Sequence, residues 1–158
     1  MLEIALELPD EQATVQLGAA LARSHDEPLV IYLSGPLGAG KSTLARAWLR
    51  ALGVVGPIKS PTYTLVEVYP INGALALHLD LYRLAGDSEL EHLGLREMWQ
   101  AARLVLIEWP EKVAAGLPGA DLIITLEVLE GGRSVRLHAL SCAARNALKA
   151  LKLAEPNA

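Results

Sequence analysis

LVIYLSGPLGAGKS, residues 29–42, joins a short apolar run to a glycine-rich loop and is the most informative part of the chain. Residues 35–42 form a complete G-x-x-x-x-G-K-[ST] phosphate-binding loop. In such a loop the glycines let the backbone wrap around phosphates, Lys41 brings a positive charge, and the Ser42 hydroxyl can hold Mg²⁺. The helical pattern that follows presents the positive end of a helix to the same anion. The sequence therefore predicts a site for a nucleoside triphosphate.

The length and composition of the chain limit what it can be. Its 158 residues correspond to about one domain, which we expect over residues 1–153, with a frayed tail over 154–158. A formal charge of −4 argues against unspecific binding to nucleic-acid phosphates. The single cysteine, Cys142, excludes an internal disulfide and a cysteine zinc site. Because we find no signal-peptide pattern and no apolar stretch of membrane-spanning length, we expect a cytoplasmic protein.

The order of apolar patterns predicts an α/β fold, a single domain resembling those of P-loop NTPases. We expect a central sheet that mixes parallel and antiparallel strands, with helices at its sides and the nucleotide at the carboxyl ends of strands. Asn72-Gly73 and Gly131-Gly132 indicate two hairpins. The expected strands cover residues 2–8, 29–33, 65–69, 74–79, 104–107, 122–129 and 134–140, and the expected helices cover 11–23, 42–50, 88–99 and 142–153.

Two acidic residues follow apolar strands directly. Asp80 comes after residues 74–79 and Glu108 after residues 104–107. A carboxylate just beyond a buried strand emerges near the phosphates, where it can hold Mg²⁺ or orient a water molecule. The alternative is that each one marks a solvent-exposed strand end. His78 is interpreted as structural, because a lone histidine in a strand is more often a satisfied core residue than a catalyst.

Missing motifs narrow the choice of nucleotide. None of the three asparagines is followed by lysine, so the guanine-reading Asn-Lys-x-Asp motif is absent, and no Asp-x-x-Gly pattern follows Asp80. ATP is therefore favoured over GTP. Arg83, Arg96 and Arg103 are scattered and do not form the arginine-rich lid of small-molecule kinases, so a kinase is a weaker alternative.

Four segments, in this order and at these spacings, resemble the bacterial TsaE (YjeE) family. They are GPLGAGKST at residues 35–43, SPTYTLV at 60–66, HLDLYRL at 78–84 and LIEWPE at 106–111. The resemblance covers roughly residues 1–140. Many families share the phosphate loop, but the joint occurrence of the other three segments is highly specific.

The resemblance implies an ATPase needed for the threonylcarbamoyladenosine modification of transfer RNA. ATP would be hydrolysed when the chain docks on the TsaD–TsaB complex, which itself transfers the threonylcarbamoyl group to adenosine in the anticodon loop. Hydrolysis would reset the complex between turnovers, and the chain would meet tRNA only through that complex. We expect the free chain to be monomeric and not bound to a membrane. A nucleotide-dependent binding switch with incidental hydrolysis remains an alternative.

The resemblance also implies roles for single residues. Lys41, Asp80 and Glu108 would serve catalysis, and Ser42 with Glu108 would hold Mg²⁺. Trp109 is expected to be exposed, near the nucleotide or a partner, although a plain core tryptophan is an alternative. Exposed residues 62–69 would sense the γ-phosphate. The residues expected to bind ATP or ADP are Glu11, Gly38, Ala39, Gly40, Lys41, Ser42, Thr43, Thr62, Asp80, Trp109 and Arg133.

Overall fold

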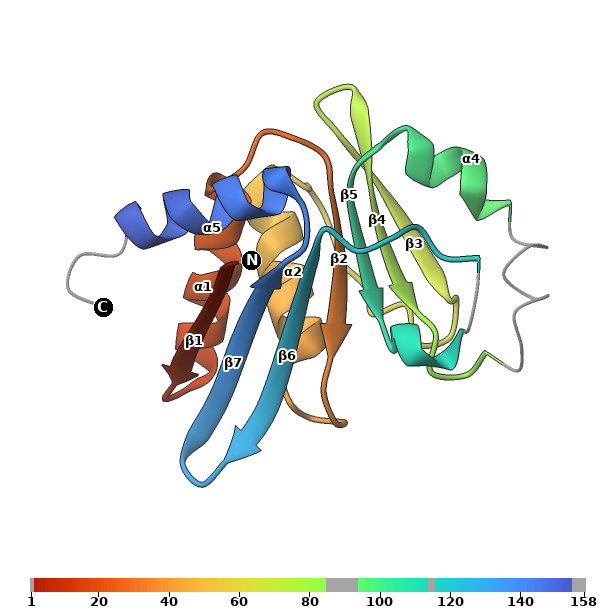
Figure 1. Ribbon diagram of the computed structural model, residues 1–158. Helices are drawn as coiled ribbons and strands as arrows, with labels where there is room; N and C mark the ends of the chain where they lie inside the picture. The colour runs from red at the N-terminus through yellow and green to blue at the C-terminus, as the bar shows by residue number, and fades with distance from the viewer. Residues whose placement is uncertain (1, 85–93, 114–115, 155–158) are drawn as a thin grey trace.

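A seven-stranded sheet in the order β1-β7-β6-β2-β5-β4-β3 forms the centre of the computed structural model, which describes residues 2–84, 94–113 and 116–154 (Figure 1). The strands are β1 Leu2–Leu8, β2 Leu29–Ser34, β3 Val66–Ile71, β4 Ala74–Asp80, β5 Ala102–Glu108, β6 Leu122–Leu129 and β7 Gly132–Ala139. Strands β6, β2, β5 and β4 run parallel, whereas β1, β7 and β3 pair antiparallel with their neighbours. The predicted α/β fold with a mixed sheet is confirmed.

Burial explains why the strands differ in sequence. The central strands β4 and β5 end in continuous buried runs, because both of their faces are covered. Strand β1 instead alternates between buried and accessible residues, as the expected edge strand should. The Asn72-Gly73 turn between β3 and β4 is confirmed, since both residues have positive φ values of 45° and 80°, as a two-residue hairpin turn requires.

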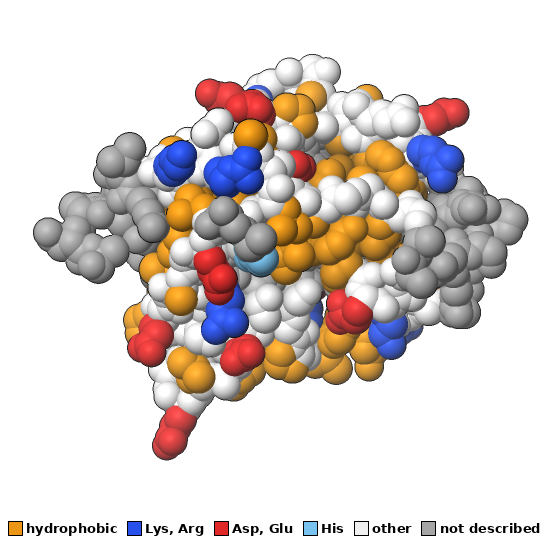
Figure 2. Space-filling view, in the orientation of Figure 1, with side chains coloured by type: hydrophobic (Ala, Val, Ile, Leu, Met, Phe, Trp, Pro, Cys, Tyr) orange, Lys and Arg blue, Asp and Glu red, His pale blue; other side chains and the backbone are white. Residues whose placement is uncertain are grey.

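Helices cover the two faces of the sheet unequally. Helices α1 (Glu11–Arg23) and α2 (Lys41–Leu52) pack on one face, and α5 (Cys142–Ala154) packs beside α1, β1 and β7 (Figure 1). The fully buried Trp48 lies in the core on this side. A smaller core under α4 (Leu95–Gln100) covers the other face of β4 and β5. Figure 2 shows hydrophobic side chains gathered over the middle of this second face.

Several boundaries differ from those expected. Strand β7 begins two residues early, because the turn is formed by Glu130 and Gly131 and not by Gly131-Gly132. Helix α5 runs through Ala154, one residue beyond the helix expected over 142–153. The rest of the predicted tail, residues 155–158, lies outside the described residues, as do residues 88–93 of the helix expected over 88–99. A 3-10 turn, η1 (Pro110–Lys112), was not predicted.

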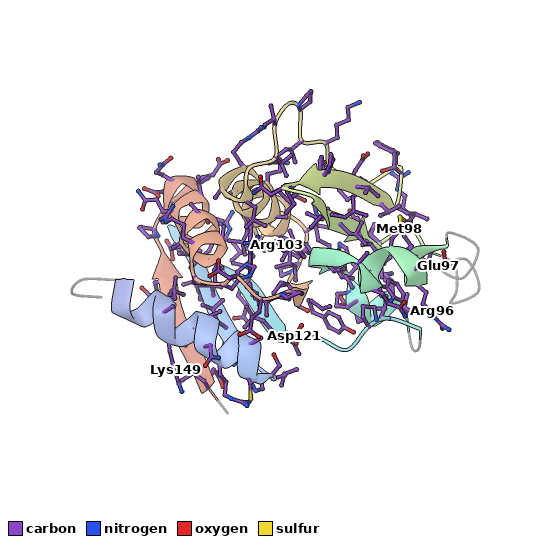
Figure 3. The ribbon with its side chains drawn as sticks, turned by 90° about the horizontal axis from the view of Figure 1, so that it is seen from above. Arg96, Glu97, Met98, Arg103, Asp121 and Lys149 are labelled. Atoms are coloured by element: carbon purple, nitrogen blue, oxygen red, sulfur yellow. The ribbon has the colours of Figure 1, made fainter. Side chains whose placement is uncertain are left out.

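The two ends of the parallel strands hold different groups of residues. At the amino ends, Asp121 ties β2 to β6 by accepting a hydrogen bond from the Val30 backbone N–H at 2.7 Å. Figure 3 looks onto this end, where Asp121 and Arg103 are labelled. The carboxyl ends, at the bottom of Figure 1, bring together the phosphate loop, Asp80 and Glu108. In the described parts of the chain, no helix is long and apolar enough to cross a membrane.

Candidate nucleotide-binding site

The phosphate loop connects β2 to α2 and depends on glycine backbone geometry. Gly35, Gly38 and Gly40 have φ values of 143°, 79° and 106°, which side-chain-bearing residues rarely adopt. A Cβ atom on Gly35 would also clash with the Leu126 carbonyl oxygen. Because Gly40 caps α2 without a side-chain hydrogen bond, the first N–H groups of the helix stay available to an anion.

Lys41 is held inside the loop. Its ammonium group donates hydrogen bonds to the carbonyl oxygens of Gly35 and Pro36, the latter at 3.2 Å, and lies 3.9 Å from the centre of the Trp109 ring. Burial lowers the pKa of the Lys41 ammonium group, while the nearby carboxylates, Glu108 foremost, partly offset this effect. A positive charge that already lies against the loop needs little movement to meet phosphate oxygens.

Ser42 and Glu108 are in direct contact. The Ser42 hydroxyl donates to the two carboxylate oxygens of Glu108 at 3.2 and 3.3 Å. On its other side, Glu108 Oε2 lies 2.6 Å from Nε2 of the fully buried His78. The two atoms predicted to hold a metal therefore lie side by side at the first turn of α2.

Asp80 stands beside Glu108 but has different partners. The two carboxylates are aligned in the register of β4 and β5, and their residues are only 6% and 3% exposed. The alternative interpretation as solvent-exposed strand ends is therefore wrong. Asp80 accepts hydrogen bonds from the Tyr82 backbone N–H at 3.0 Å and from the Thr62 hydroxyl at 3.4 Å. A pocket of about 260 Å³ opens between these groups and the phosphate loop.

Trp109 lines the same pocket and is half-buried, so the expectation of an exposed side chain is wrong. Its φ of 59° is unusual for a bulky residue and turns the chain sharply just after Glu108. The ring lies 4.9 Å from that of Tyr82, centre to centre, and also packs on Lys41. These contacts put an aromatic wall beside the loop and the carboxylates.

A second pocket, of about 420 Å³, lies on the other side of the phosphate loop. Glu11, Thr14 and Arg133 line it, and Arg133 donates a hydrogen bond to the Gly38 carbonyl oxygen at 3.2 Å. The two pockets share the loop residues Gly38, Ala39, Gly40 and Thr43. Every residue assigned to the site from the sequence lines one of these two pockets. A ligand with a triphosphate and a base could span both.

Comparison with known proteins fits this geometry. Residues 8–135 match the model of the family described as "Threonylcarbamoyl adenosine biosynthesis protein TsaE". The chain belongs to the TsaE family. Two similar proteins are both named tRNA threonylcarbamoyladenosine biosynthesis protein TsaE. The one from Haemophilus influenzae is 40% identical over 148 residues, covering 90% of this chain and 94% of its own. The one from Bacillus subtilis is 36% identical over 121 residues, covering 75% and 73%.

A solved structure has the same fold. The crystal structure of YdiB from Bacillus subtilis superimposes with a TM-score of 0.79 and covers 96% of this chain and 95% of its own. At 23% sequence identity, this likeness concerns the fold alone.

The segment expected to be exposed over residues 62–69 is only partly so. Tyr63 is 82% exposed, whereas Val66 to Tyr69 belong to β3 and Tyr69 is buried. The Tyr69 hydroxyl donates to the Lys59 carbonyl oxygen and accepts from the Lys59 N–H, which ties this strand to the preceding loop.

Sequence reasoning missed part of the lining. Tyr82, Asp10 and Thr14 line the pockets and were not assigned, although Tyr82 lies inside a segment typical of the TsaE family. Among the described residues, no group of three or more His, Cys, Asp or Glu side chains could hold a metal ion by itself. A hydroxyl and a carboxylate are the oxygen ligands that Mg²⁺ prefers, so Ser42 and Glu108 fit this ion as partners of nucleotide phosphates.

Proposed function

We propose that this chain binds ATP and ADP with Mg²⁺ and is the ATPase subunit required for the threonylcarbamoyladenosine modification of tRNA. The observation that carries the proposal is the convergence of Ser42–Glu108 and Thr62–Asp80 at the start of α2, beside a complete phosphate loop. The family of the chain supports the biological role. The two pockets, which share lining residues of the phosphate loop, support a nucleotide as the ligand.

Each group has a physical task in this proposal. The N–H groups of the loop and the Lys41 ammonium bind the phosphates. Ser42 and Glu108 hold the metal ion, which neutralises charge on the phosphates when it is bound. Asp80 accepts a hydrogen bond from the attacking water and aligns it with the γ-phosphorus, while Thr62 steadies that carboxylate. Glu11 and Arg133 lie where the base end of the nucleotide would be placed.

Hydrolysis is proposed to depend on docking to the TsaD–TsaB complex. Among the residues that the structure describes, no arginine lines the pocket that holds the carboxylates. An arginine supplied by a partner can raise the rate of phosphoryl transfer by about 10³–10⁵-fold. We therefore expect the chain alone to be a slow ATPase. The chain would meet tRNA only through the complex, and hydrolysis would reset the complex between turnovers.

The test compares phosphate release by the purified chain with and without TsaD–TsaB, while modified tRNA is followed over several turnovers. We expect the complex to raise the ATPase rate at least tenfold and modification to stop after about one turnover when the chain is omitted. If ATP binding supports repeated modification without hydrolysis, the chain is a binding switch. Equal ATPase rates, with repeated modification in the absence of the chain, would contradict the proposed function.

A further inference from the structure

His78 has no role in the proposed chemistry so far, yet it has the shortest hydrogen bond to a carboxylate of the site. It lies in β4 opposite Leu106 of β5, two residues before Asp80. Side chains alternate along a strand, so His78 and Asp80 project toward the same face of the sheet. The imidazole is fully buried, and its Nε2 lies 2.6 Å from Glu108 Oε2.

The other ring nitrogen shows where the proton of this imidazole resides. Nδ1 of His78 is buried and has no hydrogen-bond partner among the described residues. A proton on Nδ1 would be a buried donor without an acceptor, which is costly. The proton therefore belongs on Nε2, which donates it to Glu108 Oε2.

The second buried histidine, His25, is paired differently. Both ring nitrogens of His25 are paired, Nδ1 with the Glu27 carbonyl oxygen at 3.0 Å and Nε2 with the Trp48 indole N–H at 3.1 Å. His25 joins a loop to a helix through these two bonds. Within the described parts of the chain, the His78 imidazole makes its one hydrogen bond to a residue of the site, so its orientation serves that carboxylate.

We propose that His78 is a positioning residue that aims the Glu108 carboxylate at the metal, an inference that rests on the proposed function. The bond to Oε2 fixes the rotation of the carboxylate, so that both of its oxygens face the Ser42 hydroxyl at the first turn of α2, at 3.2 and 3.3 Å. Without it, the carboxylate could turn about its last bond. Loss of such a supporting hydrogen bond behind a metal ligand typically costs 10–100-fold in metal affinity or activity.

Two substitutions separate positioning from packing. His78→Leu fills the buried space without a donor, whereas His78→Gln keeps an amide N–H near the position of Nε2. ATP affinity is measured by calorimetry with Mg²⁺ and with a chelator, together with turnover and thermal unfolding. We expect His78→Leu to lower turnover and the Mg²⁺-dependent gain in ATP affinity about 10–100-fold, with the chelator value unchanged. His78→Gln should restore most of both.

A spectroscopic measurement completes the test. In a ¹⁵N-histidine-labelled protein, the His78 signals should show a proton on Nε2, and these signals should shift in Glu108→Gln. An Nε2 without a proton would overturn the proposal. So would full Mg²⁺-dependent affinity in His78→Leu, or equal losses in the leucine and glutamine variants together with lower unfolding temperatures.

Glu108→Ala tells the two possible failures apart. If this variant loses Mg²⁺-dependent affinity while His78→Leu behaves like the wild type, only the role of His78 is wrong. If Glu108→Ala also behaves like the wild type, or if the unmodified chain binds no ATP, the proposed nucleotide site itself is wrong.

Discussion

Two adjacent carboxylates of this site are distinguished by their hydrogen-bond partners. Glu108 faces the Ser42 hydroxyl and His78, whereas Asp80 is held by the Tyr82 backbone N–H and the Thr62 hydroxyl. The backbone bond at 3.0 Å fixes one oxygen of Asp80, and the other oxygen accepts the longer bond from Thr62 at 3.4 Å. This arrangement suits a group that orients water more than a group that binds metal.

Asp80→Asn tests this division of roles. The amide keeps the size of the side chain but loses the charge that draws the water proton, so turnover should fall about a hundredfold or more. ATP affinity in the presence of Mg²⁺ should stay within a few-fold, because the loop and Glu108 are intact. Phosphate release and calorimetry measure the two quantities. Asp26→Asn, an exposed carboxylate that lies 3.8 Å from Arg103, is the matched control. Normal turnover in Asp80→Asn would contradict a catalytic role.

The role of a residue could be predicted where its place in a sequence pattern indicates that role. Asp80 and Glu108 were found because each ends an apolar strand, and parallel strands bring such ends together. The role of His78 is not visible in the sequence, because its contact with Glu108, 30 positions along the chain, depends on the register of β4 and β5. The half-buried position of Trp109 depends on its positive φ, for which the sequence contains no glycine or asparagine signal.

Helices α1 and α2 approach each other closely at Gly18. A Cβ atom on Gly18 would lie 2.8 Å from both the Ala47 Cβ and the Leu44 carbonyl oxygen. Gly18→Ala should therefore push the helices apart and lower the free energy of unfolding by about 1–3 kcal/mol, outweighing the better helix propensity of alanine. Denaturant unfolding measures this change. Gly119→Ala is the control, because a Cβ there has no neighbour within 4 Å and φ is not positive. A stabilised Gly18→Ala variant would show that the contact relaxes freely.

His25, in the loop before β2, makes the stability of the fold depend on pH. Burial lowers the pKa of this imidazole below its usual value of 6.5, and the positive charge of Arg103 acts in the same direction, while the hydrogen bond to Glu27 and the charge of Asp26 oppose it. A second proton would also remove the acceptor that Trp48 uses. The unfolded chain therefore binds the proton more readily, so stability is fully present above 6.5 and is lost as the pH falls toward the lower pKa of the folded state.

Unfolding in urea at several pH values measures this effect. The free energy of unfolding should decrease as the pH falls below about 6.5. His25→Gln should lower the free energy of unfolding at neutral pH and make its decrease with falling pH smaller. A variant with the same pH dependence as the wild type would exclude His25 as its source.

The bounds of elements were predictable to within a few residues wherever local signals mark them. Asp10 caps α1 by accepting from the Ala13 backbone N–H at 2.8 Å, and Gly53 ends α2 with a φ of 110°, as expected for a capping glycine. Strand β5 begins at Ala102, before its apolar run at 104–107, because the pairing with β4 extends back to Ala102. The order of the strands was not predictable, since β6 lies beside β2 although 87 residues, 35–121, lie between the two strands in the sequence.

The phosphate loop is bonded to strands on both sides of β2. Arg133 at the start of β7 bonds to the loop from one side, and the Glu108–Ser42 contact reaches it from β5 on the other. The two buried clusters lie on opposite faces of the sheet, and the larger one, under α1 and α2, contains residues of all seven strands. A nucleotide that touches both pockets would contact residues on both sides of β2. Binding should therefore stabilise the whole fold and not only the loop.

Thermal unfolding with ATP and Mg²⁺ tests this connection. A ligand at a hundred times its Kd adds about 2.7 kcal/mol of stability, which corresponds to a rise of about 5–10 °C in Tm for a domain of this size. Lys41→Ala removes a charged donor that lies against the loop, and we expect its ATP affinity to fall about tenfold or more. At the same ATP concentration its rise in Tm should then be roughly half that of the wild type or less. Lys149→Ala, on the exposed side of α5 (Figure 3), is the matched control and should keep the full rise. An equal rise in Lys41→Ala would place the nucleotide somewhere other than the phosphate loop.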